Sequence, residues 1–206
     1  MMQVNGDILI RSVLLQAGFV SFLFFGAELG DVTLAANQVL LQFVYLASYA
    51  MDGFVFAAES LVGQAMGAKA VAQLRRGASV TAVWTFGLAF IMAAGFWIVG
   101  PFMIDVMAKD PGVQQAARLY LSHMVFAPLL GALAWMLDGV FIGATRTKDM
   151  RNMMILSFLG YCGLVLLLLP NFGNHGLWMA MNGFFILRGV SLALRYPALE
   201  RVAAAP

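Results

Sequence analysis

Apolar residues run along this chain in long stretches that short polar or charged segments separate. Each stretch is long enough to cross a hydrocarbon core about 30 Å thick, which takes about 20 residues of helix. The runs are continuous rather than alternating, and lipid obliges each segment to satisfy its own backbone hydrogen bonds, so helices are favoured over a β-barrel. The pattern predicts an all-α integral membrane protein with six transmembrane helices, at approximately residues 8–27, 34–61, 78–99, 119–144, 153–169 and 176–194.

Composition supports this prediction and excludes an ordinary water-soluble domain. The chain is 62% hydrophobic and 11% charged, and its mean hydropathy is +0.87. The first apolar stretch is too long for the apolar region of a signal peptide and no small-residue cleavage site follows it, so we interpret it as a true span. No hydrophilic domain or low-complexity linker interrupts the spans. We therefore expect residues 1–206 to form a single six-helix transmembrane lobe.

Cations predict the orientation of the spans, because short loops rich in Lys and Arg stay in the cytoplasm. If there are six crossings, three cationic segments fall on one side together with the N-terminus. They are the loop after the second span, the loop after the fourth span and the C-terminal tail, with Lys69, Arg75, Arg76, Arg146, Lys148, Arg151, Arg195 and Arg201. Both termini are therefore expected in the cytoplasm.

No motif for nucleotide chemistry is present. The phosphate-binding pattern GxxxxGK[ST] and the dinucleotide-binding pattern GxGxxG are both absent. Any transport must then use an ion gradient or passive flow, with no cofactor. An intramembrane protease is disfavoured because no GxSG lies beside a histidine within a span, so the chain is not expected to be an enzyme. The spacing of potential ligands supports no metal site, and no nucleic-acid partner is expected.

Acidic residues inside the spans are the sharpest local signal, because a carboxylate in the bilayer costs several kcal/mol and usually faces a cavity or a partner. Asp52 and Glu59 are seven residues apart, which places both on one face of the second span. Asp138 lies about 12 Å inside the cytoplasmic end of the fourth span. Each acid is a candidate for a polar path for substrate or ions. The alternative for each is a structural carboxyl that bonds neighbouring helices.

Four other polar residues in or near the spans have two interpretations. Gln16 and Gln42 could line the same path or bond one helix to another. Arg11 and Arg188 could face a cavity, but long cationic side chains near helix ends reach out to the interface, and we expect that behaviour for both.

The second and fourth spans share a local pattern. Each contains an Asp-Gly pair, Asp52-Gly53 in one and Asp138-Gly139 in the other, and ends at a cationic loop. Each also contains GxxxG, a spacing that lets membrane helices approach closely, at 63–67 and at 139–143. Chance in a glycine-rich chain explains this shared pattern equally well.

Two segments resemble a known transporter family. "LGDVTLAANQVLLQFVYLASYAMDGFVFAAESLVGQAMGA" and, two spans later, "DGVFIGATRTKDMRNMM" are similar to the multidrug and toxic compound extrusion (MATE) family, and most similar to its DNA-damage-inducible F (DinF) branch. The resemblance covers nearly the whole chain but only the second half of such a transporter. It implies one lobe of a twelve-helix protein that exports cationic or amphipathic compounds in exchange for H⁺ or Na⁺. The branch also implies a bacterial inner (plasma) membrane as the location.

The resemblance also implies roles for particular residues. Asp138 matches an acid of the tenth family helix that takes part in cation coupling in some members, whereas Asp52 and Glu59 fall in an eighth-helix motif whose role is largely structural. Where some members have a coupling glutamate, this chain has Leu15 beside Gln16.

We therefore expect the lipid bilayer, small cationic or amphipathic substrates, and a complementary N-terminal six-helix lobe or self-association as partners. The alternative is a non-transporting membrane fragment or an assembly subunit of a split transporter.

Overall fold

A computed structural model describes residues 2–204, with side chains from residue 4 onward, and it is all-helical. Each of its helices is long and apolar enough to cross a membrane. The predicted fold class, six membrane-spanning helices, is confirmed. The helices are α1 (Met2–Glu28), α2 (Asp31–Gly67), α3 (Val71–Met107), α4 (Pro111–Gly143), α5 (Thr147–Phe172) and α6 (Asn174–Ala203).

The helices continue well beyond the apolar stretches at several ends. Arg75 and Arg76 belong to the first turns of α3, and residues 195–203 extend α6 rather than forming an irregular tail. A helix satisfies its own backbone hydrogen bonds in headgroups and water as well as in lipid, so charged residues end the apolar stretch without ending the helix. The connections that remain are very short.

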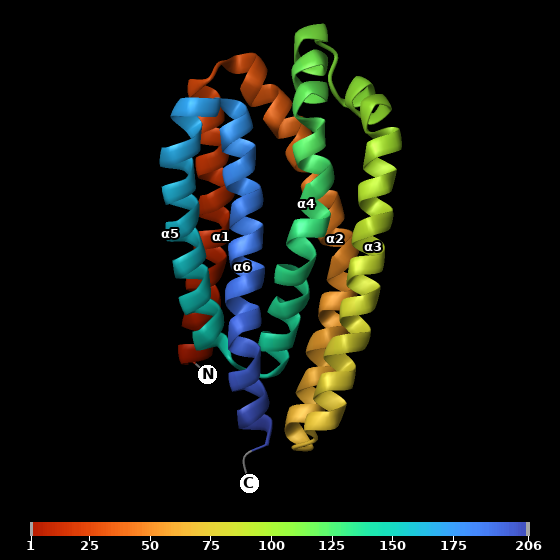
Figure 1. The fold of residues 1–206 in the computed structure, drawn as a ribbon, viewed down its shortest axis with the longest axis vertical. Coiled ribbons are helices and arrows are strands. Elements are labelled where there is room, and N and C mark those ends of the chain that lie inside the picture. Colours follow the sequence, from red (N-terminus) through yellow and green to blue (C-terminus); the bar gives the residue numbers. More distant parts are fainter. Residues whose placement is uncertain (1, 205–206) are drawn as a thin grey trace.

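The helices form two groups of three (Figure 1). The first group contains α1, α5 and α6, and the second contains α2, α3 and α4. The groups meet mainly where α4 packs against α6. Both ends of the described chain lie at the same end of the bundle, together with the α2–α3 and α4–α5 connections (Figure 1). The cationic loops of the sequence are thus at one end, and which side of a membrane this end faces stays a prediction.

Close packing of α2 against α4 depends on glycines. A Cβ built on Gly139 would collide with the carbonyl oxygen of Val55, and one on Gly143 would collide with that of Glu59. The GxxxG at 139–143 therefore brings the two helix backbones together, as its spacing predicts. The other GxxxG contributes at one position only, because Gly63 faces the Gly143 carbonyl oxygen and Gly67 faces nothing within 4 Å.

Turn chemistry starts and ends the helices. Asp110 caps α4, where its side chain accepts hydrogen bonds from the backbone N–H groups of Gly112 and Val113 at 2.7 and 3.1 Å, with Pro111 at the first helical position. At the same end of the bundle, Gly30 and Gly173 adopt φ values of 113° and 53°, which glycine adopts without strain. These turns reverse the direction of the chain between α1 and α2 and between α5 and α6.

Candidate functional site

The predicted site residues lie in three different settings. Asp138 is buried, with 4% of its surface exposed. Gln42, Asp52 and Glu59 lie along the outward side of α2, where Gln42 is exposed and the two acids are partly exposed. Gln16 is exposed on α1. The structure therefore does not bring the five residues into one site.

Asp138 is held by two arginines from other helices. Its Oδ2 atom accepts a hydrogen bond from Arg188 Nη2 of α6 at 2.8 Å and another from Arg11 Nη2 of α1. The side chain of Asp138 is 6% exposed, that of Arg188 2% and that of Arg11 15%. We call these three residues the Arg11–Asp138–Arg188 cluster. It joins the two three-helix groups, because Asp138 comes from one group and both arginines come from the other.

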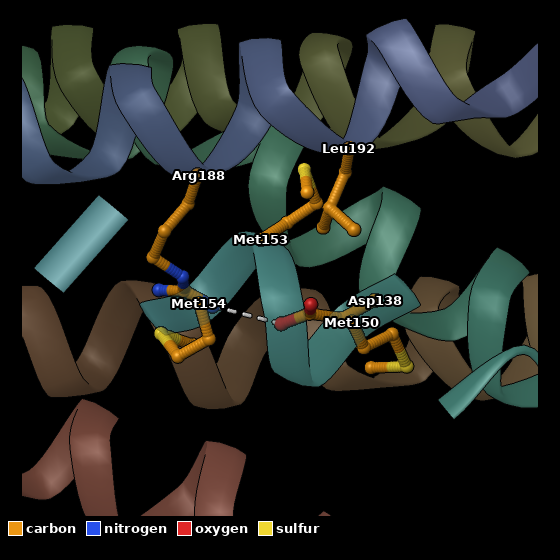
Figure 2. Close-up of a pocket in the computed structure, with 6 residues that line it drawn as sticks. All are labelled: Asp138, Met150, Met153, Met154, Arg188 and Leu192. Carbon is orange, nitrogen blue, oxygen red and sulfur yellow. Dashed lines mark hydrogen bonds and ion pairs between the residues drawn. The ribbon is translucent and has the colours of Figure 1, made fainter. Parts of the chain in front are cut away.

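The expectation that Arg188 reaches out to the interface is wrong. Its side chain turns inward toward Asp138 (Figure 2). A buried carboxylate on the facing helix offers the guanidinium a partner of opposite charge, which compensates for the lost hydration. The guanidinium also lies over the Phe184 ring, with 5.7 Å from Cζ to the ring centroid. Arg11 likewise bends toward Asp138 and stays partly exposed.

A narrow hollow adjoins the cluster. It is lined by Asp138 and Arg188 and otherwise by apolar side chains, Met150, Met153, Met154 and Leu192 (Figure 2). Its empty space is about 160 Å³, and no water-sized sphere fits inside it. Methionine side chains have several rotatable bonds and adapt their shape easily. The hollow is therefore closed in this arrangement by flexible groups.

A second feature is a stripe of residues on the outward side of α2, which we call the α2 stripe. Its members recur at alternating spacings of four and three, the repeat of one helix face. All are exposed or partly exposed, and Tyr49 reaches 70%. Within the described residues, Asp52 and Glu59 have no side-chain hydrogen bond or ion pair. The α2 stripe consists of Gln38, Gln42, Tyr45, Tyr49, Asp52, Phe56 and Glu59.

Sequence reasoning missed three polar contacts that hold the helices together. Near the chain's N-terminus, Asp7 is buried and accepts hydrogen bonds from Arg151 Nη1 at 2.6 Å and Thr147 Oγ1 at 3.1 Å, which ties α1 to α5. At the opposite end, Asn37 pairs with Asn174 and accepts from Trp178 Nε1. The third contact joins the two histidine rings, His123 Nε2 and His175 Nδ1, at 3.0 Å.

The sequence alone does not predict these contacts, because each joins residues more than fifty positions apart in the chain. A polar residue in an apolar stretch shows that a partner exists without naming it. Among the described residues, no group of three or more His, Cys, Asp or Glu side chains is placed to hold a metal ion.

Comparison with known proteins tests the resemblance seen in the sequence. DNA damage-inducible protein F of Escherichia coli K12 is 38% identical over 199 residues, which are 94% of this chain and 42% of that protein. Protein DETOXIFICATION 42 of Arabidopsis thaliana is 28% identical over 166 residues, covering 79% of this chain and 32% of that protein. This chain thus spans less than half the length of either relative.

Solved structures give the same picture of the fold. The Vibrio cholerae MATE transporter VcmN, in its bent form, superposes with a TM-score of 0.86 at 18% identity and covers 97% of this chain but 46% of that one. A likeness at this identity concerns the fold alone. The family model MatE matches residues 8–168 of the sequence, which is most of the chain. The chain therefore belongs to the MATE family of multi-pass membrane transporters, not to a family of enzymes, and it corresponds to about half of such a transporter.

Proposed function

We propose that the chain is the C-terminal six-helix lobe of a secondary-active multidrug efflux transporter, which exports cationic or amphipathic compounds in exchange for H⁺ or Na⁺. Family membership and the coverage of less than half of each relative support this proposal. The observation that carries it is the α2 stripe, because a membrane helix does not present amides and carboxyls to lipid. The stripe instead faces a water-filled cavity or a second lobe.

The stripe implies a partner of about the same size as this chain. A complementary six-helix lobe packed opposite α2 would enclose the polar side chains between two halves, and self-association would do the same. Transporters built from repeated halves place their substrate near the bilayer midplane between the halves, which rock around it. On this arrangement Gln42, Asp52 and Glu59 border the path from this lobe, and Gln16 contributes from α1.

Asp138 is our candidate for the coupling residue. Its carboxylate neutralises one of two arginines and links α4 to α1 and α6. Binding a proton or a cation at this carboxylate weakens both ion pairs, so it changes the balance between arrangements of the two three-helix groups. Coupling therefore acts through the packing of the lobe.

Complementation tests the function. Expressed alone, the chain should not export ethidium from cells, and co-expression with a matching N-terminal lobe should restore export. Export by the chain alone, with no crosslinked dimer, would contradict the half-transporter proposal. Failure of every matching lobe to restore export would favour the alternative, a non-transporting fragment or assembly subunit.

A test of coupling by Asp138 requires a charge-balanced variant, because Asp138→Asn alone leaves two arginines without their carboxylate. The double variant Asp138→Asn/Arg188→Gln removes one charge of each sign and leaves Arg11 able to reach the interface. In the assembled transporter we expect normal abundance and weakened, pH-independent efflux. Normal efflux with normal pH dependence would discard the coupling role.

Localisation in the inner membrane with cytoplasmic termini can be tested by cysteine labelling in a Cys162→Ser background. Ala72 and Lys148 are exposed at the end of the bundle that holds the termini, and Gly112 is exposed at the other end. An impermeant maleimide added to intact cells should label a cysteine at Gly112 and not one at Ala72 or Lys148. The reverse pattern would invert the orientation.

A further inference from the structure

The Arg11–Asp138–Arg188 cluster has one more positive charge than its single carboxylate can neutralise. Both guanidinium groups donate to the same Asp138 oxygen, Oδ2. Two cations and one anion leave a net charge of +1 between helices that cross a membrane. An uncompensated charge in such a place is costly, so a second anion would be bound favourably.

The donors for a second anion are already present. A guanidinium carries five N–H donors. Within the described residues, Arg188 Nε, Arg188 Nη1 and Arg11 Nε are buried and have no hydrogen-bond acceptor. The hollow beside Arg188 has no room for a water molecule in this arrangement, so it offers no acceptor to the two Arg188 donors. The Phe184 ring, whose centroid is 5.7 Å from Arg188 Cζ, attracts the cation but supplies no oxygen acceptor, so it offsets only part of the cost.

Access to the cluster is from Arg11. Its side chain is 15% exposed, whereas that of Arg188 is 2% exposed. In the described part of the chain the backbones of α1 and α4 do not pack against each other, and the Arg11 side chain spans the distance to Asp138. Arg11 can therefore exchange its partner without repacking two helix backbones.

We propose that Arg11 is the binding site for a second carboxylate, which pairs with Arg11 while Asp138 remains with Arg188. A carboxylate matches the planar fork of a guanidinium with two parallel hydrogen bonds, and its single charge balances the surplus of +1. The source is either a carboxylate-bearing amphipathic solute or an acidic side chain of a complementary lobe. The choice between these two sources rests on the proposed function, whereas the existence of the site does not.

Binding can be measured on the chain itself in phosphatidylcholine nanodiscs, where no anionic lipid competes. Benzoate is the probe, and the thermal unfolding midpoint is followed at constant ionic strength. We expect benzoate to raise the midpoint saturably and chloride not to do so, because a ligand that binds the folded state stabilises it. Arg11→Gln should weaken the effect of benzoate by about tenfold or more, because it removes a charge-assisted, bidentate donor.

Arg75→Gln is the matched control. Arg75 is also an arginine with a carboxylate partner, Glu200, but its side chain is 65% exposed, and the response to benzoate should be unchanged. Since Arg11→Gln could impair folding, direct binding of radiolabelled benzoate to the unaltered chain gives a readout that needs no variant. Acetate in excess should displace it, and tetraphenylphosphonium, a cation, should not.

Adding a complementary lobe distinguishes the two sources. Loss of benzoate binding in the assembled protein would identify an acid of that lobe as the second carboxylate, and retained binding would identify a carried solute. The proposal is overturned if the isolated chain binds no benzoate, or if a folded Arg11→Gln variant responds as the unaltered chain does. Neither result depends on transport. The proposed function can therefore fail while this site is confirmed, and the site can fail while the proposed function is confirmed.

Discussion

The two Asp-Gly segments of this chain share a sequence pattern and have opposite environments. Asp138 is buried in α4 and receives hydrogen bonds from two arginines. Asp52 lies on the outward side of α2, where no described side chain contacts it by a hydrogen bond or ion pair. The two segments pack directly against each other, since Gly139 meets the backbone of Val55. Their difference therefore arises from which way each helix face points.

This comparison separates two uses of a carboxyl in a membrane bundle. In α4 the acid faces inward and its charge is matched within the lobe, so it contributes to the architecture. In α2 the acid faces outward as part of the α2 stripe and has no partner here. A carboxyl of the first kind constrains the lobe, and one of the second kind is available to something outside it.

The largest expected effect is a difference in the free energy of unfolding between variants of the two acids. Asp138→Asn leaves the buried Arg188 and the partly exposed Arg11 without a counter-charge, and breaking a buried ion pair in this way costs about 3–5 kcal/mol. Asp52→Asn removes no hydrogen bond or ion pair to a described residue and should change the free energy of unfolding by less than about 0.5 kcal/mol. Thermal unfolding in nanodiscs measures both.

The charge-balanced variant Asp138→Asn/Arg188→Gln is the control for this prediction, because it should regain most of the lost stability. If Asp138→Asn were as stable as Asp52→Asn, the cluster would not hold the two helix groups together, and the contrast between the two acids would disappear.

A smaller effect is expected from the glycine in each pair. Gly139→Ala places a methyl group against the Val55 carbonyl oxygen, which cannot move without shifting α2, and overpacking of this kind costs about 1–3 kcal/mol. Gly53→Ala meets nothing within 4 Å and should stabilise the helix by about 0.5–1 kcal/mol. A lower unfolding midpoint for Gly139→Ala and a higher one for Gly53→Ala would confirm that only one of the two Asp-Gly pairs lies in a helix contact.

Sequence reasoning succeeded where the signal is local. The six spans follow from apolar length, and the close approach at Gly139 and Gly143 follows from spacing. It failed at Arg188, because a single arginine near a helix end carries no information about a carboxylate fifty residues earlier. The net charge of the cluster is likewise a property of three helices together. Spacing within α2 did place Asp52 and Glu59 on one face, but only the packing of the other helices determines that this face points outward.

The smallest effect is expected at another ion pair that joins the two helix groups. Arg75 of α3 donates to Glu200 of α6 at 2.8 and 2.9 Å, beyond the apolar stretches of both helices. This pair connects the same two groups as the Arg11–Asp138–Arg188 cluster, but the Arg75 side chain is 65% exposed. Water and salt screen an exposed pair, and holding two long side chains in place costs entropy, so Glu200→Gln should leave the unfolding midpoint essentially unchanged.

Unfolding at low and high salt checks this reason. The midpoints of the unaltered chain and Glu200→Gln should converge as salt rises, whereas the lower midpoint of Asp138→Asn should persist. A Glu200→Gln deficit as large as that of Asp138→Asn would mean that linkage of the two groups, rather than burial of charge, sets the energetic difference between these sites.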